Sequence, residues 1–536
     1  MTEDARFAWG TAVVDGEADD HPCKLWDPRR RRVPELLADM APFADRDFLV
    51  QGERRITYAA HERAVQRIAG RLIAAGIHPG DRVVLFSANH PEAIAAWWAI
   101  LQVGAVAVLA NGWWSSEEIA GAIERTGPAL VIADARRADR LPAGAPLLAV
   151  EALEPDLDEP GAGSRVAAPD PGDEGDPAVI LFTSGTTGFP KGAVLSHRAV
   201  IANLHNLLAR QGSLPQQQDL GRRPIVNLLG LPLFHISGLQ TMLLNALTGG
   251  RLVFRSATRF DPAEILELVE RERIDVLGAV PTMLGRLVEH PDIAVRDVSS
   301  VRVVATGGMP VPPVLLDRLR TAFPAARRGL GAIYGLSESG GVLTMISGAD
   351  YEARPTSSGP PLPVVELRIA APDETGTGEV LARSPTNMTG YWGQPDDMTV
   401  DADGWLHTGD LGRLEDGHLV LVGRSKDVII RGGENVAAPH VESCLLTHPA
   451  VTEVAVVGLE HPDLGEEVAA AVVLRPGASV DATDLAAFAG EHLAAFAVPT
   501  AWWIRKDPLP VTASGKIVKH ELRTQWPAPA STREGQ

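Results

Sequence analysis

The sequence predicts an α/β protein built from more than one domain. At 536 residues, the chain is too long for a single ordinary hydrophobic core. Helical patterns alternate with short aliphatic strands from residue 56 to 134, and again from 178 to 343. This alternation is typical of βαβ units, in which helices join the parallel strands of a sheet. Beyond Gly359, short strands and glycine-rich turns predict an antiparallel segment, followed by a small α+β unit.

The first alternating region contains expected strands at 82–86 and 130–132. Between them, the run from Ala93 to Ala110 is almost entirely apolar. Gln102 and Gly104 divide this run, so it predicts a buried helix up to residue 103 and then a strand. We therefore expect no stable insertion into a membrane.

A connection rich in Pro, Gly, Asp and Glu, residues 154–177, precedes the second alternating region. Strands are expected in that region at 178–182 and 301–304. The last residues, 527–536, are interpreted as a disordered tail.

The charge of the chain limits its partners. A formal charge of −19, from 49 basic and 68 acidic residues, argues against nonspecific binding to nucleic acid or anionic membranes, which are polyanions. A small phosphorylated ligand remains compatible, because a local site can be positive inside an acidic protein. The basic run Arg29–Arg32 is interpreted as solvated surface.

The cysteine content and the N-terminus bear on the compartment. The two cysteines, Cys23 and Cys444, are far apart in the sequence, which predicts neither a disulfide scaffold nor a cysteine-based zinc site and fits a reducing environment. The first residues, MTEDARFAWG, lack the basic-then-apolar layout of a signal peptide. A cytoplasmic location is expected.

The strongest motif is the run from Thr183 to Gly192, TSGTTGFPKG, which follows a buried strand. Glycines let the backbone approach a ligand closely, hydroxyls donate to phosphate oxygens, and Lys191 adds positive charge. The run therefore predicts a polyphosphate-binding loop instead of a flexible linker. It differs from the loop of P-loop NTPases, because Lys191 is followed by Gly192 where those proteins have Ser or Thr.

This run resembles the signature of the adenylate-forming superfamily, which includes acyl-CoA synthetases, nonribosomal peptide adenylation domains and luciferases. The resemblance implies that the loop binds the β- and γ-phosphates of ATP. The resemblance assigns this role to Thr183, Ser184, Gly185, Thr186, Thr187, Gly188 and Lys191.

A second motif is Tyr334–Glu338, YGLSE. An aromatic ring beside a glycine turn and a carboxylate can stack a base and hold Mg²⁺. The resemblance implies that Tyr334 and Gly335 lie at the adenine, that Ser337 meets the α-phosphate, and that Glu338 coordinates Mg²⁺, with Thr183 as a second metal ligand. The motif also approaches the G-x-S-x-G elbow of hydrolases, but Ser339 stands where that elbow needs glycine.

Two further motifs resemble the ribose site of the family: Thr408–Asp410, TGD, and Gly423–Asp427, GRSKD. The resemblance implies that Asp410 accepts hydrogen bonds from the ribose hydroxyls and that Arg424 approaches the same sugar. The alternative for Arg424 is a surface salt bridge. Further matches are the adenine-pocket pair Gly307 and Gly308, followed by Met309, and the runs 378–380 and 390–392.

Near the C-terminus, residues 509–517, LPVTASGKI, resemble the catalytic-lysine loop of the family, which assigns that role to Lys516. The family hinge matches Lys426. The loop presented to the thiol substrate matches 431–436, with Gly432 and Gly433 as expected cofactor-binding residues. The proline that follows this loop, Pro439, comes one residue later than in the common pattern.

The resemblance implies a fold as well. We expect a large N-terminal domain, 1–425, made of two doubly wound α/β subdomains and a small β-barrel, and a small mobile α+β domain, 426–536. ATP, Mg²⁺ and coenzyme A are the implied substrates and cofactors.

The expected acid is lipophilic. The run 232–238, PLFHISG, resembles the aromatic-histidine motif of acyl-CoA synthetases. His235 stands where amino-acid-activating relatives have Asp, which argues against an α-amino acid, although a structural histidine is the alternative. The small residues Gly307, Gly308, Gly331 and Ala332 leave acyl space, which favours a fatty or bulky alicyclic acid, and Met309 reshapes the pocket.

The predicted reaction has two halves. A carboxylate attacks the α-phosphate of ATP and pyrophosphate leaves; the thiol of coenzyme A then attacks the acyl-adenylate. Crowded negative charge at phosphorus calls for preorganised cations, which Lys191, Lys516 and the metal on Glu338 supply. Three alternatives remain: loading of a carrier-protein phosphopantetheine, a single half-reaction, and a nucleotide-binding pseudoenzyme. The oligomeric state is left open.

Overall fold

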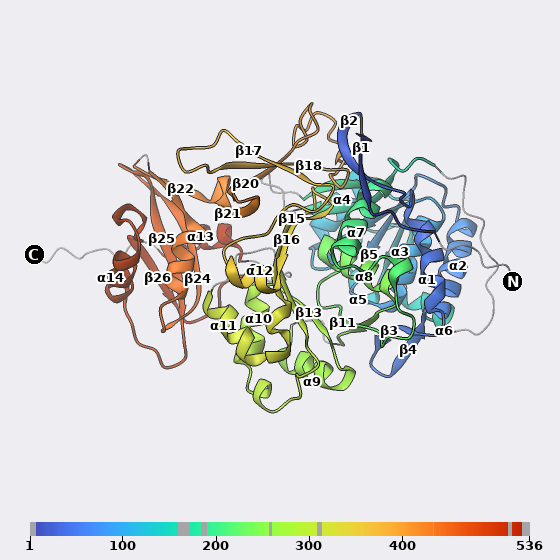
Figure 1. The fold of residues 1–536 in the computed structure, drawn as a ribbon, viewed down its shortest axis with the longest axis horizontal. Coiled ribbons are helices and arrows are strands. Elements are labelled where there is room, and N and C mark those ends of the chain that lie inside the picture. The colour runs from blue at the N-terminus through green and yellow to red at the C-terminus, as the bar shows by residue number, and fades with distance from the viewer. Residues whose placement is uncertain are drawn as a thin grey trace, which may run out of the picture.

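The computed structural model describes residues 7–158, 172–183, 190–256, 260–307, 313–432, 434–512 and 517–527. It confirms the α/β class. Figure 1 shows the large domain, with two sheets flanked by helices, and the small C-terminal domain at the left. A separate antiparallel sheet lies between them along the top of the view.

The first sheet has the strand order β19-β10-β9-β6-β5-β7-β8. Strands β5 to β9 pair in parallel, and β10 pairs antiparallel with β9 and β19. The strands are β5 (Arg82–Phe86), β6 (Val106–Leu109), β7 (Leu130–Ala133), β8 (Leu147–Ala149), β9 (Pro177–Thr183), β10 (Lys191–Ser196) and β19 (Gly390–Tyr391). The helices of this part of the chain are α1 (Leu36–Met40), α2 (Tyr58–Ala74), α3 (Pro91–Gln102), α4 (Ser116–Thr126), α5 (Ala135–Ala138), α6 (Glu154–Asp158) and α7 (His197–Arg210).

The apolar run at 93–110 is divided as predicted. It forms α3 and β6, with Gly104 in the left-handed region at φ 76° between them. Every residue of α3 is buried, because the helix packs inside the largest core of the large domain. Among the helices of the described segments, none is long and apolar enough to cross a membrane.

The second sheet has the order β16-β15-β14-β13-β11-β12-β3-β4. Strands β3 and β11 to β15 run parallel, so their carboxyl ends share one edge. The strands are β3 (Asp47–Gln51), β4 (Arg54–Thr57), β11 (Val226–Leu228), β12 (Arg251–Phe254), β13 (Val276–Gly278), β14 (Val303–Gly307), β15 (Leu330–Leu336) and β16 (Gly341–Ser347). The associated helices are α8 (Ile236–Thr248), α9 (Pro262–Glu272), α10 (Pro281–Glu289), α11 (Pro313–Ala322) and α12 (Gly348–Ala353).

The change to antiparallel pairing beyond Gly359 is confirmed. The strands β17 (Glu366–Ala370), β18 (Gly378–Arg383), β20 (Leu406–Glu415) and β21 (His418–Arg424) form a separate sheet in the order β17-β18-β20-β21. This sheet stands where the resemblance implies a small barrel.

The small domain has its own sheet and core. Its sheet has the order β23-β22-β25-β24, and β26 pairs in parallel with β25. The elements of the small domain are β22 (Val428–Arg431), β23 (Glu434–Ala437), β24 (Val451–His461), β25 (Gly465–Leu474), β26 (Ala501–Arg505), α13 (Ala438–Leu446), α14 (Ala482–His492) and α15 (Lys519–Thr524).

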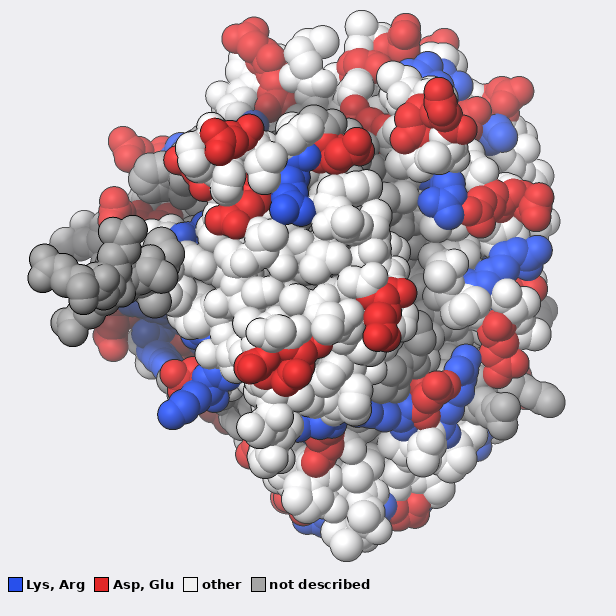
Figure 2. Space-filling view, turned by 90° about the vertical axis from the view of Figure 1, so that its left-hand side faces the viewer, with Lys and Arg blue, Asp and Glu red and all other residues white. Residues whose placement is uncertain are grey.

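Figure 2 shows the left-hand face of Figure 1. On this face, acidic and basic side chains surround a broad area without charged residues.

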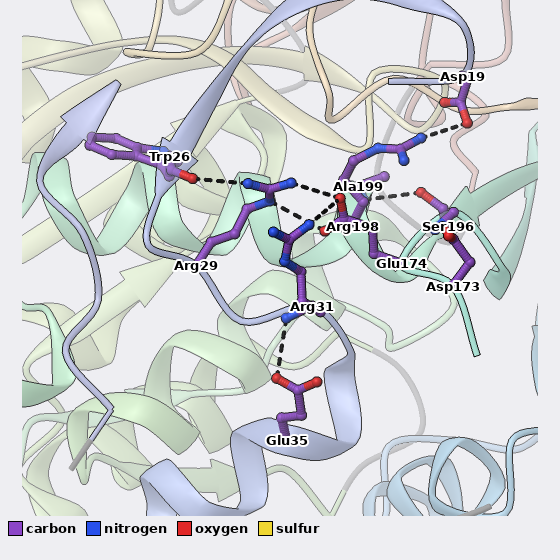
Figure 3. A network of polar contacts seen from close by, with 11 residues as sticks. Asp19, Trp26, Arg29, Arg31, Glu35, Asp173, Glu174, Ser196, Arg198 and Ala199 are labelled. Atoms are coloured by element: carbon purple, nitrogen blue, oxygen red, sulfur yellow. Dashed lines mark hydrogen bonds and ion pairs between the residues drawn. The ribbon is translucent and has the colours of Figure 1, made fainter. Parts of the chain in front are cut away.

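The interpretation of Arg29–Arg32 as solvated surface is wrong for most of the run. The run follows the hairpin β1 (Ala12–Ala18) and β2 (His21–Asp27). Arg29 donates to Glu174 at 2.7 Å, Arg30 donates to Asp39 at 2.7 Å, and Arg32 is buried. Arg31, which also pairs with Glu174, is the most exposed of the four. Figure 3 shows the two guanidinium groups that meet at Glu174. The carboxylates come from distant parts of the chain, so the local charge run could not reveal them.

A buried histidine predicts a pH-dependent stability. His61 in α2 is fully buried, 5.1 Å from Phe48 between ring centroids, and among the described residues neither of its ring nitrogens has a hydrogen-bond partner. Burial lowers the pKa of His61 to about 3. Below about pH 6.5, the unfolded chain takes up a proton that the folded state excludes, so this group costs about 1.4 kcal/mol of stability per pH unit as the pH falls toward 3.

We therefore expect His61→Leu to reduce the loss of thermal stability between pH 7 and pH 5. Leucine also removes two buried polar atoms without partners, so the variant is expected to melt at or above the wild-type temperature at pH 7. Thermal unfolding followed by circular dichroism measures both effects, with the exposed His78 changed to Leu as the control. An unchanged pH slope in His61→Leu would contradict the assignment.

Candidate nucleotide and acyl site

The predicted phosphate loop connects two paired strands. Thr183 ends β9, Lys191 begins β10, and the antiparallel register places these two residues opposite each other. The ladder therefore brings the first hydroxyl and the lysine of the motif side by side. The predicted loop residues Ser184, Gly185, Thr186, Thr187 and Gly188 lie outside the described residues.

Lys191 is held by two groups of one later segment. Its Nζ lies 2.8 Å from Oδ2 of Asp397 and 4.6 Å from the ring centroid of Tyr391. Although burial favours the protonated acid, hydrogen bonds from Lys191 and Thr399 lower the pKa of Asp397, so this carboxylate is charged at neutral pH. Sequence reasoning missed Asp397, whose only local signal is a Pro-Asp-Asp turn.

Tyr391 joins the phosphate loop to the predicted metal residue. Its hydroxyl donates to Oε1 of Glu338 at 2.9 Å, and its side chain is also hydrogen-bonded to Thr183. Burial first, and the negative charge of Glu338 next, raise the pKa of Tyr391, so the hydroxyl keeps its proton. The structure thus brings Thr183, Lys191 and Glu338 together around one ring.

Ser337 and Glu338 lie in the turn between β15 and β16. Met388 donates its backbone N–H to the carbonyl of Glu338 at 2.8 Å, which fixes the turn against the segment that leads to Tyr391. Gly335 is required just before this turn, because a Cβ there would lie 1.9 Å from the carbonyl oxygen of Gly341. Both side chains are half-buried and stand at the end of β15.

The predicted ribose residues also meet. Asp410 and Arg424 are direct partners in the register of β20 and β21, and Nε of Arg424 donates to Oδ1 of Asp410 at 2.9 Å. The hydroxyl of Tyr334, from β15, donates to Oδ2 of the same carboxylate at 2.8 Å. Burial, followed by the nearby Asp410, raises the pKa of Tyr334. Arg424 is exposed, but its partner Asp410 is buried, so its ion pair is not confined to the surface.

His235 occupies a neighbouring position. It precedes the first turn of α8 and lies 4.7 Å from the ring of Phe234, which in turn contacts Trp113 at 5.1 Å between centroids. Gln240 on the same helix contacts the carbonyl of Gly340, so α8 lies against the turn that carries Glu338. Trp113 was not predicted, because an exposed tryptophan in a loop has no distinctive sequence signal.

The remaining predicted residues fall into three groups: Gly432 lies away from this cluster, Gly307 lies beside it, and four others fall outside the described ranges. Gly432 lies in the turn between β22 and β23, where its N–H donates to Leu464 within the small domain. Gly307 ends β14 and pairs with Ile333 of β15, which places it beside Tyr334. Gly308, Met309, Gly433 and Lys516 lie outside the described residues.

Comparison with known proteins identifies the family. The model of the AMP-binding enzyme matches residues 37–392, and that of the AMP-binding enzyme C-terminal domain matches residues 440–516. The chain belongs to the AMP-binding enzymes. It is an ATP-dependent acid–thiol ligase of the acyl-CoA synthetase branch of the adenylate-forming superfamily.

Curated relatives of this AMP-binding enzyme are acyl-CoA ligases. A feruloyl-CoA synthase from Amycolatopsis sp is 35% identical, with 92% of this chain and 98% of that protein covered. The long-chain-fatty-acid–CoA ligase FadD13 of Mycobacterium tuberculosis is 32% identical, with 94% and 98% covered. The crystal structure of ATP-bound MatB from Rhodopseudomonas palustris has a TM-score of 0.81 at 29% identity, and the match covers 92% of this chain and 98% of that one.

The residues of this AMP-binding enzyme fit a magnesium ion. Glu338 and Thr183 offer a carboxylate and a hydroxyl around Tyr391, and oxygen is the ligand type that Mg²⁺ prefers. Within the described ranges, no group of three or more His, Cys, Asp or Glu side chains could hold a metal ion. Mg²⁺ is commonly held by one or two carboxylates together with substrate phosphates, and Glu338 would supply one such carboxylate.

Proposed function

We propose that this ligase activates a lipophilic carboxylic acid, fatty or bulky and alicyclic, as its acyl-adenylate and transfers the acyl group to coenzyme A. The observation that supports the acid class is the apolar lining of a small cavity of about 20 Å³ between β11, β13, α9 and α10, which has to widen before an acyl chain can enter. Its lining includes Leu228, Phe260, Leu277, Met283, Leu284 and Leu287.

The position of this cavity supports its use by the acyl chain. Leu228 and Gly278, the last residues of β11 and β13, both line it. In the sheet order, β13 is followed by β14 and β15, whose ends carry Gly307 and the Tyr334–Glu338 motif. The cavity and the nucleotide residues thus lie at the same edge of one parallel sheet, where ligands of open α/β sheets bind. The half-buried Arg255 also lines the cavity.

The proposed chemistry follows from the side chains of this site. Lys191 interacts with the leaving phosphates, Ser337 donates to the α-phosphate, and Asp410 and Arg424 orient the ribose, so that the acid can attack phosphorus in line. Lys516 adds a second cation at the developing charge. Magnesium, when bound, neutralises part of the triphosphate charge. His235 stands on the acyl side of the turn at Glu338.

A panel of acids tests the proposal. Fatty, arylpropenoic, alicyclic and short polar acids are compared by kcat/KM for AMP release with ATP, Mg²⁺ and coenzyme A. We expect the lipophilic acids to exceed the short polar acids by at least tenfold, because each buried methylene contributes about 0.8 kcal/mol. Faster turnover of short polar acids would overturn the acid class. A parallel assay with a holo carrier protein distinguishes the two thiols, and pyrophosphate exchange without thiol detects an isolated adenylation.

We expect Tyr391→Phe to raise the KM for Mg·ATP roughly tenfold, because a hydrogen bond to a charged group contributes about 1.5–3 kcal/mol. Phenylalanine keeps the ring beside Lys191 but cannot donate to Glu338. Initial rates over a Mg·ATP titration measure the effect. Tyr351→Phe, at a buried tyrosine in α12, is the matched control. Equal KM values in wild type and Tyr391→Phe would show that the hydroxyl does not position Glu338.

A further inference from the structure

Two ion pairs of opposite polarity join the large domain to the small domain. Arg286 and Glu289 lie on α10, one turn apart. Nη2 of Arg286 lies 3.2 Å from Oε1 of Glu453 on β24. Oε1 of Glu289 lies 3.5 Å from Nη1 of Arg475, which follows β25, and 2.6 Å from Nη1 of Arg318 in the large domain. Because each charge on α10 meets its opposite, the contact favours one orientation of the small domain over others.

The carboxylate of Glu453 has a second role. Its other oxygen, Oε2, accepts a hydrogen bond from the backbone N–H of Leu509 at 2.8 Å. Leu509 is buried against Ala455 and Leu522, so this part of the chain is anchored in the small domain. One carboxylate therefore connects α10 to the beginning of the 509–517 motif.

The segment after Leu509 returns on itself. Val518 donates its N–H to the carbonyl of Pro510 at 2.8 Å, and Val511 pairs with Ile517 in an antiparallel bridge. These bonds form the stem of a hairpin, and Lys516 belongs in sequence to the chain between its two arms. Through its ion pair with Glu453, Arg286 therefore keeps the base of this stem next to α10.

Helix α10 also borders the proposed acyl site. Met283, Leu284 and Leu287 on this helix line the apolar cavity, and the helix begins shortly after β13 ends. The ion pairs are half-exposed, with 39% of the Arg286 side chain and 18% of the Glu453 side chain accessible. Pairs with this exposure are weak. A weak contact suits an orientation that has to be left when the second half-reaction begins.

We propose that Arg286 is a positioning residue for adenylation: its ion pair with Glu453 holds the small domain with the stem of the lysine hairpin against α10. The inference rests on the proposed function, because it assigns Lys516 to the first half-reaction. Adenylation requires the Arg286–Glu453 contact, whereas thioester formation from an already formed adenylate does not require it.

The test uses full-length variants and measures the two half-reactions separately. Arg286→Glu reverses the charge, Arg286→Lys keeps it, and Glu453→Gln removes the ion pair while its amide oxygen still accepts from Leu509. The matched control is Arg296→Glu, which breaks the pair with Glu270 within the large domain, at 2.9 Å and similar exposure. Single-turnover adenylation is followed with ATP and acid, and thioester formation with supplied acyl-adenylate and coenzyme A.

We expect Arg286→Glu to slow adenylation roughly three- to tenfold, and Glu453→Gln to slow it about two- to fivefold, because exposed pairs contribute little each. Thioester formation by these variants should be at least as fast as in the wild type. The Arg286→Lys variant should adenylate at close to the wild-type rate. Added salt should slow adenylation by the wild type more than adenylation by Arg286→Glu. Equal slowing of both half-reactions, or an equal effect of Arg296→Glu, would overturn the proposal.

A measurement without turnover separates this inference from the proposed function. Small-angle scattering of the unliganded proteins should give Arg286→Glu a larger radius of gyration than wild type and Arg296→Glu. Identical radii would overturn the ion-pair contact even if every variant were active. If the wild type formed neither adenylate nor thioester with any acid, the proposed function and the selective role in adenylation would both fail, whereas the scattering result would still decide the contact.

Discussion

Replacing Lys516 by alanine is expected to slow adenylate formation by roughly 10²- to 10³-fold. A lysine about 4 Å from a unit charge contributes roughly 4 kcal/mol at an effective dielectric constant near 20. That charge develops at the α-phosphate only as the acid attacks, so the loss should appear in the rate of adenylation more than in the affinity for ATP. Pyrophosphate exchange in the presence of the acid measures it.

Two controls make this result specific. Lys506, exposed in the same domain, is changed to alanine and should exchange pyrophosphate at the wild-type rate. Thioester formation from supplied acyl-adenylate should survive in Lys516→Ala, because that step does not involve the triphosphate. A loss of less than tenfold in pyrophosphate exchange would remove Lys516 from the catalytic role.

Changing Asp410 to asparagine is expected to raise the KM for ATP by roughly 10- to 100-fold, since each hydrogen bond to a charged acceptor contributes about 1.5–3 kcal/mol. The carboxylate receives Tyr334 and Arg424, and we propose that it also accepts hydrogen bonds from the ribose hydroxyls. Asparagine keeps one oxygen that can accept a hydrogen bond. Its NH₂ group, however, replaces the second carboxylate oxygen and faces an N–H or O–H donor, from which it cannot accept.

The comparison of ATP with 2′,3′-dideoxy-ATP identifies the cause of this effect. Wild type should discriminate strongly between them, and Asp410→Asn should do so weakly. Asp373→Asn, at an exposed turn, serves as the control. Should the variant discriminate as well as wild type, the ribose assignment would be wrong, and the loss of affinity would reflect only the disturbed position of Tyr334.

The elements that the sequence predicted are those with a local signal. The helix and strand at 93–110 follow from the position of Gly104, and the alternation of strands and helices predicts parallel sheets. The site residues Thr183, Lys191, Tyr334, Glu338, Asp410 and Arg424 were proposed from motifs, and strand registers explain why they meet. Asp410 and Arg424, for example, are cross-strand partners.

The features that sequence reasoning missed depend on distant pairing. Asp397 matters because the turn that carries it lies against Lys191, and nothing in its neighbours indicates this partner. The arginines at 29, 30 and 32 are largely buried because Glu174, Asp39 and His197 lie beside them. A local charge run contains no information about such partners, so its burial cannot be predicted from composition.

The bond between Tyr334 and Asp410 joins two sheets that are hydrogen-bonded independently of each other. Tyr334 packs in one cluster with Val342 from its own sheet and with Val380 and Leu419 from the other. Any sliding of one sheet over the other therefore changes the spacing between the aromatic ring and the carboxylate. On the proposed ribose site, substitutions of these apolar residues are therefore expected to change the affinity for ATP through the spacing of Tyr334 and Asp410.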